Sequence, residues 1–471
     1  MREYKAFINN EFIDNGEWLE IINPTTLKPA GKVTALKSED INQAYQAART
    51  AQTTWSALPL LKRIEYVNNF KKELLKNKEE LATIMSEEVA KGYKEALGEV
   101  ERTAEIIDYT IEEVKRLDPL AMTGEGMGAT NKIGIFSRVP KGVVCAISPF
   151  NYPVNLAIAK IAPALLTGNT VVFKPATAGS LCGAFFAKLA LAAAFPKGIF
   201  NVVTGRGREI GDLITANPEI DMISFTGSVG VGNQLRKNAS TTDLVLELGG
   251  KDPALVLDNL QLEKYATEII AGAFGYSGQR CTAIKRVLVS DAIADQLVPI
   301  LKAKVEALTV GQPQDNANIT PVIDEKSADF IQGLIDDAKK QGAKIICGDK
   351  RVKNLMWPTL VDGVSVKMRL AWEEPFGPVL PIIRVNSPAE MIKIANESNF
   401  GLQASVFCQD LSTAIVVAKQ IQTGTVNING RSQRGPDCFP FLGIKDSGEG
   451  VQGIREALLS MTRYQGIVIN Y

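Results

Sequence analysis

Hydrophobic and polar positions divide the chain into a helical opening and regions where short apolar runs recur. Residues 38–117 read as successive amphipathic helices. From residue 141, apolar runs such as 143–148 and 170–174 alternate with amphipathic stretches such as 153–167. Strands that alternate with helices are typical of a parallel sheet with helices on both faces. The pattern therefore predicts an α/β protein with a doubly wound parallel sheet.

A second alternation begins after Gly250. The apolar runs 253–258 and 285–290 flank a helical stretch near 261–275, and further helices and strands follow. This repetition predicts a second α/β domain, which holds Cys281. The length of 471 residues agrees with about three domains.

Charge and composition exclude several classes of protein. Lys plus Arg and Asp plus Glu both number 52, so no global charge favours nucleic acid or an anionic membrane surface. The most apolar stretches, 154–168 and 181–195, are interrupted by lysine, and the polar start lacks an apolar signal core. Six cysteines form no CxxC pair. We expect a cytoplasmic protein with no nucleic-acid partner and no membrane partner.

The chain contains no histidine, which restricts the chemistry of its site. Cysteine–histidine and Ser-His-Asp catalysis are excluded, and we expect no metal site. A working cysteine would need backbone donors to lower its pKa, and Cys281 lies in such a glycine-rich turn, GYSGQRCTA. The matching base would be a carboxylate, and Glu247 lies at a strand end in LELGGKD. Burial should raise the pKa of Glu247, unless it pairs with a lysine such as Lys251.

Five motifs occur in a recognisable order: SPFNYP at 148–153, FTGSVGVG at 225–232, LELGGKD, FGYSGQRC, and EEPFGPV at 373–379. In content and spacing they resemble the aldehyde dehydrogenase superfamily, from INNEFID near residue 8 to the terminus. The chain looks most similar to the branch of non-phosphorylating, NADP-dependent glyceraldehyde-3-phosphate dehydrogenases.

The resemblance implies three domains. Residues 1–118 and 141–248 would form the dinucleotide-binding domain, and residues 249–445 the catalytic domain. Residues 119–140 and 446–471, which fit neither alternation, would form a small β oligomerisation element. We therefore expect a homotetramer.

The resemblance also implies catalytic roles. Cys281 would attack the aldehyde carbon, and Glu247 would activate the hydrolytic water. The Asn151 amide, with the backbone N–H of Cys281, would hold the oxyanion. A bound coenzyme's positive ring would help to activate the thiol.

The expected coenzyme is NADP. Its ribose, pyrophosphate and nicotinamide contacts would come from Lys174, Thr177, Gly227, Ser228, Glu374 and Phe376. NAD-preferring relatives often carry a glutamate at the position of Thr177, which would repel a 2′-phosphate. A second glycine string, 205–211, could also seat phosphate at a helix start.

The substrate contacts implied by the branch are cationic and phenolic. They carry over to Arg102, Tyr152, Arg280 and Arg434. Arginine forks suit a phosphate dianion. Pro436 and Cys438 depart from the pattern of the branch in the loop after Arg434.

Together these features predict oxidation of D-glyceraldehyde 3-phosphate to 3-phosphoglycerate with NADP⁺, through a cysteine thiohemiacetal and a thioester that water hydrolyses without inorganic phosphate. An alternative is another anionic aldehyde, such as succinate semialdehyde. A coenzyme-A-acylating enzyme is disfavoured by Glu247, because such relatives generally lack it. A non-catalytic protein on this scaffold, as in some lens crystallins, is disfavoured by the intact Cys281, Glu247 and Asn151.

Overall fold

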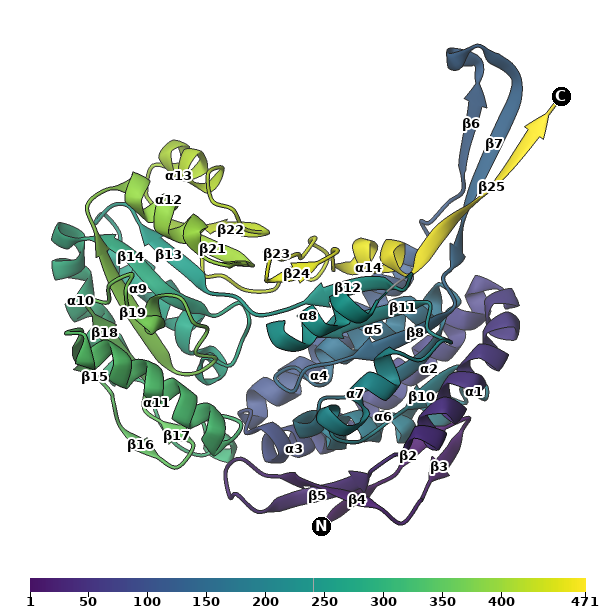
Figure 1. The fold of residues 1–471 in the computed structure, drawn as a ribbon, viewed down its shortest axis with the longest axis horizontal. Helices are drawn as coiled ribbons and strands as arrows, with labels where there is room; N and C mark the ends of the chain where they lie inside the picture. Colours follow the sequence, from purple (N-terminus) through teal and green to yellow (C-terminus); the bar gives the residue numbers. More distant parts are fainter. Residues whose placement is uncertain (240) are drawn as a thin grey trace.

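The computed structural model describes residues 1–239 and 241–471. Two lobes, each built on one large sheet, face each other, and a narrow arm projects from one of them (Figure 1). Within the described part of the chain, no helix combines the length and the apolar character needed to cross a membrane.

The first lobe contains an eight-stranded sheet. Its order is β24 (Gly448–Glu449), β12 (Asp243–Glu247), β11 (Met222–Thr226), β8 (Val143–Ile147), β9 (Thr170–Lys174), β10 (Phe200–Val202), β2 (Ala6–Ile8) and β3 (Glu11–Ile13). The five strands from β12 to β10 run parallel, and antiparallel strands close both edges. This confirms the predicted doubly wound parallel sheet.

Helices cover both faces of this sheet because its strands are apolar on both sides. In β8, Val144 and Ala146 pack into one core, whereas Val143 and Cys145 pack into the other. The first core receives α2 (Leu60–Lys76), α3 (Lys78–Val89), α4 (Tyr93–Val114), α5 (Asn155–Leu166) and α6 (Ser180–Ala192). The second receives α7 (Gly207–Thr215), α8 (Val229–Asn238) and most of α1 (Ser38–Ala57).

The second lobe repeats this construction. Its sheet order is β15 (Lys344–Cys347), β18 (Thr359–Asp362), β19 (Val379–Val385), β14 (Ile284–Ser290), β13 (Asp252–Val256), β21 (Gln403–Phe407) and β22 (Thr425–Ile428). One face packs against α9 (Leu262–Phe274) and α10 (Asp291–Glu306). The other packs against α11 (Glu325–Lys340), α12 (Pro388–Glu397) and α13 (Leu411–Ala418).

Smaller strand groups complete the fold. They are the sheet β1 (Arg2–Tyr4), β5 (Pro29–Thr34) and β4 (Trp18–Ile22), and the pairs β16 (Arg351–Val352) with β17 (Leu355–Met356) and β20 (Phe400–Gly401) with β23 (Ile444–Lys445).

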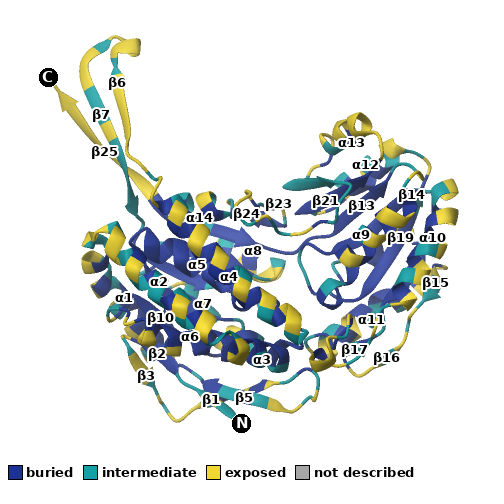
Figure 2. Cartoon of the chain, turned by 180° about the vertical axis from the view of Figure 1, so that it is seen from behind, coloured by how far each residue is buried: buried dark blue, intermediate teal, exposed yellow. Residues whose placement is uncertain are grey.

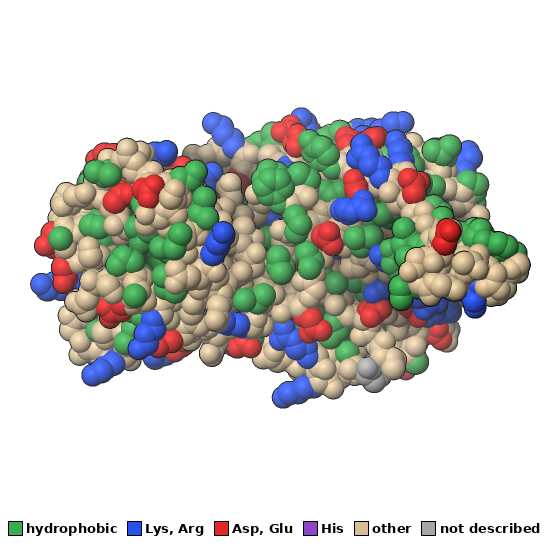
Figure 3. Space-filling view, turned by 90° about the horizontal axis from the view of Figure 1, so that it is seen from above, with side chains coloured by type: hydrophobic (Ala, Val, Ile, Leu, Met, Phe, Trp, Pro, Cys, Tyr) green, Lys and Arg blue, Asp and Glu red, His purple; other side chains and the backbone are tan. Residues whose placement is uncertain are grey.

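The arm is a three-stranded antiparallel sheet of β6 (Leu120–Gly124), β7 (Ala129–Pro140) and β25 (Thr462–Asn470). Most of its residues are exposed or half-buried (Figure 2), and Met122, Ile467 and Val468 are among its exposed apolar side chains. Apolar side chains are visible on the surface of the arm (Figure 3). The predicted terminal segment 446–471 belongs to it only in part. β24 pairs with β12, and α14 (Ile454–Ser460) packs against α4 and α5, so this segment joins the arm only from β25 onward.

Candidate active site

Cys281 lies on an irregular turn between α9 and β14, and this turn is held in an unusual backbone conformation. Tyr276 and Ser277 adopt left-handed φ angles of 49° and 54°. Residues other than glycine rarely adopt such angles unless their surroundings enforce them. The Tyr276 hydroxyl donates to the backbone oxygen of Val89 at 2.6 Å, and Ser277 Oγ donates to that of Thr320 at 2.9 Å. These buried contacts fix the turn that presents the thiol.

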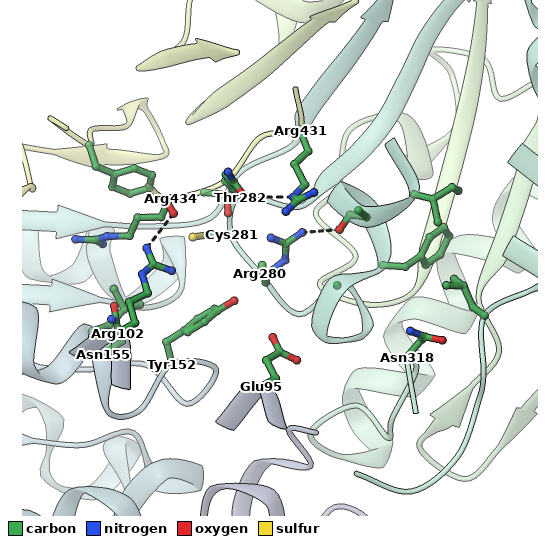
Figure 4. Close-up of a pocket in the computed structure, with 18 of the residues that line it drawn as sticks. Glu95, Arg102, Tyr152, Asn155, Arg280, Cys281, Thr282, Asn318, Arg431 and Arg434 are labelled. Atoms are coloured by element: carbon green, nitrogen blue, oxygen red, sulfur yellow. Dashed lines mark hydrogen bonds between the residues drawn. The ribbon is translucent and has the colours of Figure 1, made fainter. Parts of the chain in front are cut away.

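Two cavities meet at Cys281. The first, about 620 Å³, is here named the arginine cavity; with Cys281, its walls include Arg102, Tyr152, Glu247, Arg280 and Arg434 (Figure 4). The second, about 780 Å³, is here named the glycine cavity; with Cys281, its walls include Asn151, Lys174, Thr177, Gly227, Ser228, Glu374 and Phe376. Every site residue expected from the sequence therefore lines one of these cavities. A thiol at their junction can reach ligands in both.

The Cys281 thiol is less acidic than the sequence suggested. Burial raises its pKa to about 11, although the nearby Lys285 ammonium acts in the opposite direction. The expectation that the turn lowers this pKa is therefore wrong. Lys285, which sequence reasoning missed, is buried, donates to the Cys281 carbonyl and pairs with Glu374 at 2.9 Å. A lysine inside the apolar strand β14 was the available signal.

Glu247 ends β12 and is nearly inaccessible to solvent. Burial alone would raise its pKa, but Arg434 and then Lys160 stabilise the carboxylate and lower the pKa to about 2. The predicted upward shift is therefore wrong. Lys160 Nζ lies 2.9 Å from Glu247 Oε2, and Arg434 Nη1 contacts Oε1. Lys251, the partner considered from the sequence, instead donates to the carbonyl of Glu373.

Asn151 follows β8 at the carboxyl edge of the first sheet. Its amide Nδ2 donates to the Gln279 carbonyl at 2.8 Å, two residues before the thiol. The backbone carbonyl of Asn151 accepts from Lys91 Nζ at 2.6 Å. The Lys91 ammonium is fully buried, pairs with Glu99 and lies 3.8 Å above the Tyr152 ring. Lys91 and Glu99, which sequence reasoning missed, thus hold the Asn151 segment in place.

The arginines of the arginine cavity converge from distant parts of the chain. Arg102 on α4 makes a two-pronged contact with Asp437, at 2.6 and 2.8 Å, and donates to the Arg434 carbonyl. Asp437 therefore anchors the loop that carries Arg434. Arg280 donates through Nη2 to the Gly272 carbonyl, whereas its buried Nε has no acceptor among the described residues. An unpaired buried donor favours an anionic ligand.

The glycine cavity offers positive charge and backbone donors at helix starts. Burial lowers the pKa of Lys174 to about 8, and no carboxylate among the described residues compensates its charge. Ser228 caps α8, where its Oγ accepts from the Val231 N–H at 3.5 Å. Gly207 at the start of α7 lines the same cavity, so both glycine strings face it. Helix starts attract phosphate groups, and these residues fit an anionic dinucleotide.

Glu374 and Phe376 close the end of the glycine cavity next to the thiol. Glu374 accepts from the Gly250 N–H at 3.1 Å and lies so close to Gly249 that a Cβ there would be 2.1 Å from Oε2. The Phe376 ring meets Phe150 edge to face, with centroids 5.8 Å apart. A flat polar ligand could lie beside these two side chains.

Comparison with known proteins agrees with this geometry. The model of the aldehyde dehydrogenase family matches residues 12–467. The chain is 49% identical over 471 residues to the NADP-dependent glyceraldehyde-3-phosphate dehydrogenase of Streptococcus equinus, covering 100% of this chain and 99% of that protein. It is 36% identical over 478 residues to the 3-sulfolactaldehyde dehydrogenase of Priestia aryabhattai, covering 100% and 98%.

A solved structure supports the same relationship. The NADP-dependent glyceraldehyde-3-phosphate dehydrogenase of Bacillus halodurans C-125, crystallised with NADP, superimposes with a TM-score of 0.98. The two chains are 52% identical, and the match covers 100% of each. The order of the five motifs, the two-lobed fold and these matches together show that the chain belongs to the aldehyde dehydrogenase family.

Proposed function

We propose that the protein oxidises D-glyceraldehyde 3-phosphate to 3-phosphoglycerate with NADP⁺. One observation carries this proposal: several guanidinium groups, among them those of Arg102, Arg280 and Arg434, and the Tyr152 hydroxyl line a single cavity with the thiol of Cys281 and the carboxylate of Glu247. Guanidinium groups bind phosphate dianions through paired hydrogen bonds. The names of the Streptococcus equinus and Bacillus halodurans relatives support both the phosphorylated aldehyde and the coenzyme.

Cys281 begins the reaction as the nucleophile. The thiol gives up its proton to solvent water, and the thiolate sulfur adds to the aldehyde carbon. The carbonyl oxygen becomes an oxyanion that can accept from the Asn151 amide and the Cys281 N–H. Bound NADP⁺ supplies the acceptor for the hydride of this adduct, and a thioester on Cys281 results. Lys174, Ser228 and the start of α8 would hold the coenzyme's ribose and phosphates in the glycine cavity, with Thr177 beside the ribose.

Glu247 completes the reaction. It accepts a proton as water adds to the thioester carbonyl, the C–S bond breaks, and the thiolate returns as the acid leaves. Water takes the acyl group, so no acyl phosphate forms and no inorganic phosphate is needed. The presence of Glu247 also argues against transfer to coenzyme A.

Initial rates in phosphate-free buffer test the assignment. Purified protein should form NADPH with D-glyceraldehyde 3-phosphate and release an equal amount of 3-phosphoglycerate. Omitting phosphate should not lower the rate. Failure to reduce NADP⁺ with this aldehyde under these conditions would contradict the proposed function.

A second candidate substrate is another anionic aldehyde. The Priestia aryabhattai relative is named for 3-sulfolactaldehyde, and arginines can also bind a sulfonate or a carboxylate, as in succinate semialdehyde. A panel of these aldehydes, compared by kcat/KM, separates the candidates. The highest kcat/KM should belong to the phosphorylated aldehyde.

We further propose a cytoplasmic homotetramer assembled through the arm. The outer strands of the arm, β6 and β25, each pair with only one neighbour in the described chain, and Met122, Ile467 and Val468 are exposed there. Unpaired edges and apolar patches favour association. Light scattering after gel filtration should give four subunits for the full chain, and a chain ending at residue 461 should give fewer.

A further inference from the structure

Both carboxylate oxygens of Glu247 are engaged in this structure. Oε1 accepts from Arg434 Nη1, whereas Oε2 contacts Lys160 Nζ and accepts from Thr226 Oγ1. A carboxylate held by two cations is a poor base, because accepting a proton would cost both ion pairs. Glu247 is therefore not yet prepared to take a proton from water.

The two cations differ in what can reach them. Lys160 is fully buried on α5 and lines neither cavity. Arg434 lines the arginine cavity, where its guanidinium lies 4.9 Å from the Phe441 ring and its Nε lies 3.9 Å from Asp437. An anion in the arginine cavity can compete for Arg434 but has no access to Lys160.

We propose that Arg434 makes thioester hydrolysis conditional on the substrate's phosphate. The phosphate draws the guanidinium away from Glu247 Oε1, and this oxygen becomes free to accept a proton from water. Lys160 and Thr226 keep hold of Oε2 and preserve the orientation of the carboxylate. The inference rests on the proposed function, in which Arg434 binds phosphate.

Arg434 would thus determine specificity at the second chemical step as well as at binding. An unphosphorylated aldehyde can form the thioester on Cys281, because the nucleophile and the oxyanion donors do not contact Arg434. Its hydrolysis would be slow while Arg434 remains on Glu247. The phosphorylated aldehyde carries the group that releases the base.

The test follows the glyceroyl thioester formed from unphosphorylated glyceraldehyde. Enzyme with NADP⁺ is mixed with glyceraldehyde and stripped of free aldehyde, and intact-protein mass spectrometry follows the acylated fraction. Phosphite dianion, which is not transferred to the acyl group, replaces the missing phosphate. We expect phosphite to accelerate loss of the thioester by about tenfold or more, within the usual contribution of a general base. Chloride at matched ionic strength should have no such effect.

Two variants sharpen the result. Arg434→Gln should lose the thioester quickly without phosphite and show no further acceleration. Arg431→Gln is the matched control, because Arg431 lines the same cavity but pairs with Glu268, at 3.4 Å. It should retain the phosphite response. Thermal unfolding of both variants checks that they fold. The phosphite titration of the wild-type protein tests the proposal without relying on either variant.

The outcomes separate this inference from the proposed function. The inference alone is overturned if two results occur together. Arg434→Gln removes the preference for glyceraldehyde 3-phosphate, and phosphite does not change the rate of thioester loss in the wild type. Absence of any preference for the phosphorylated aldehyde overturns the proposed function and the inference with it. No accumulation of thioester from glyceraldehyde also overturns the inference, since hydrolysis would then be fast without phosphate.

Discussion

The glycine cavity and the arginine cavity share the Cys281 thiol but hold charge in different ways. In the glycine cavity, Lys174 is buried with no compensating carboxylate among the residues that the structure describes, and helix starts point inward. In the arginine cavity, Arg102 is bound to Asp437 and Arg434 to Glu247. A ligand that engages Lys174 and the helix starts can therefore bind in the first with little rearrangement of charge, whereas a ligand that engages Arg102 or Arg434 in the second must exchange ion pairs. The comparison indicates that the charges that attract the coenzyme are already free to bind it. Binding of the substrate, by contrast, can change the ion pair that controls Glu247.

The largest effect should come from the residue that both cavities share. Cys281→Ala removes the nucleophile, and no histidine exists to replace it. Turnover should fall by at least about 10⁴-fold. NADP⁺ affinity, measured by calorimetry, should stay within about threefold, because the coenzyme contacts lie elsewhere in the glycine cavity. Retention of substantial turnover by the purified variant would mean that another group attacks the aldehyde.

The next effect concerns the acidity of the thiol. Burial raises the pKa of Cys281 to about 11, so in coenzyme-free enzyme its thiolate fraction is small at neutral pH and grows as pH rises toward that value. Alkylation by iodoacetamide at pH 7 should be about 100-fold slower at Cys281 than at an unperturbed thiol. The exposed Cys438 shows in the same experiment that the reagent is active. Equal rates at the two cysteines, resolved by peptide mass spectrometry, would contradict this environment.

Arg434→Ala tests whether Arg434 binds the substrate's phosphate in the arginine cavity. Losing a charge-assisted hydrogen bond to phosphate should cost about 1.5–3 kcal/mol, seen as a higher KM for glyceraldehyde 3-phosphate. Unphosphorylated glyceraldehyde should show a much smaller change in KM. Steady-state kinetics on both aldehydes measure the difference. Equal losses would assign phosphate recognition to residues other than Arg434.

The smallest effect is expected in the glycine cavity. Thr177→Glu places a carboxylate where the ribose 2′-phosphate would lie, which adds repulsion of about 1 kcal/mol in a partly buried site. The ratio of kcat/KM for NADP⁺ to that for NAD⁺ should fall by about fivefold. Thr177→Gln, of similar size but neutral, serves as the control. An unchanged ratio in Thr177→Glu would place the 2′-phosphate away from residue 177.

The central strands could be predicted from the sequence because they are buried along their length, and most helices because their buried positions recur at helical spacing. The apolar run 170–174 coincides with β9, and 143–148 extends only one residue beyond β8. A parallel sheet covered on both faces needs such continuous apolar strands, so the pattern is hard to mistake. The expected site residues likewise line two adjoining cavities. Glu247 ends β12 and Ser228 caps α8, as their motifs indicate, whereas Arg102 lies within α4 and Arg434 in a loop.

The electrostatics of the site could not be predicted. The sequence indicates that Glu247 is buried, but not that Arg434, 187 residues away, would reach its carboxylate. The sign of a pKa shift depends on such contacts, and burial alone gives the wrong sign here. Lys91, Lys160 and Lys285 were missed for the same reason. A lysine in an apolar segment becomes informative only once its partner is known.

The most direct test of the account is the origin of the new oxygen in the product. We would run the reaction with D-glyceraldehyde 3-phosphate and NADP⁺ in ¹⁸O-labelled water, with and without inorganic phosphate, and analyse 3-phosphoglycerate by mass spectrometry after a few minutes. Hydrolysis of a Cys281 thioester predicts at least one labelled carboxylate oxygen per product, with a second where the aldehyde oxygen has exchanged through its hydrate. It also predicts one NADPH per product, at the same rate in both buffers. Formation of an acyl phosphate, or a strict requirement for inorganic phosphate, would contradict the account.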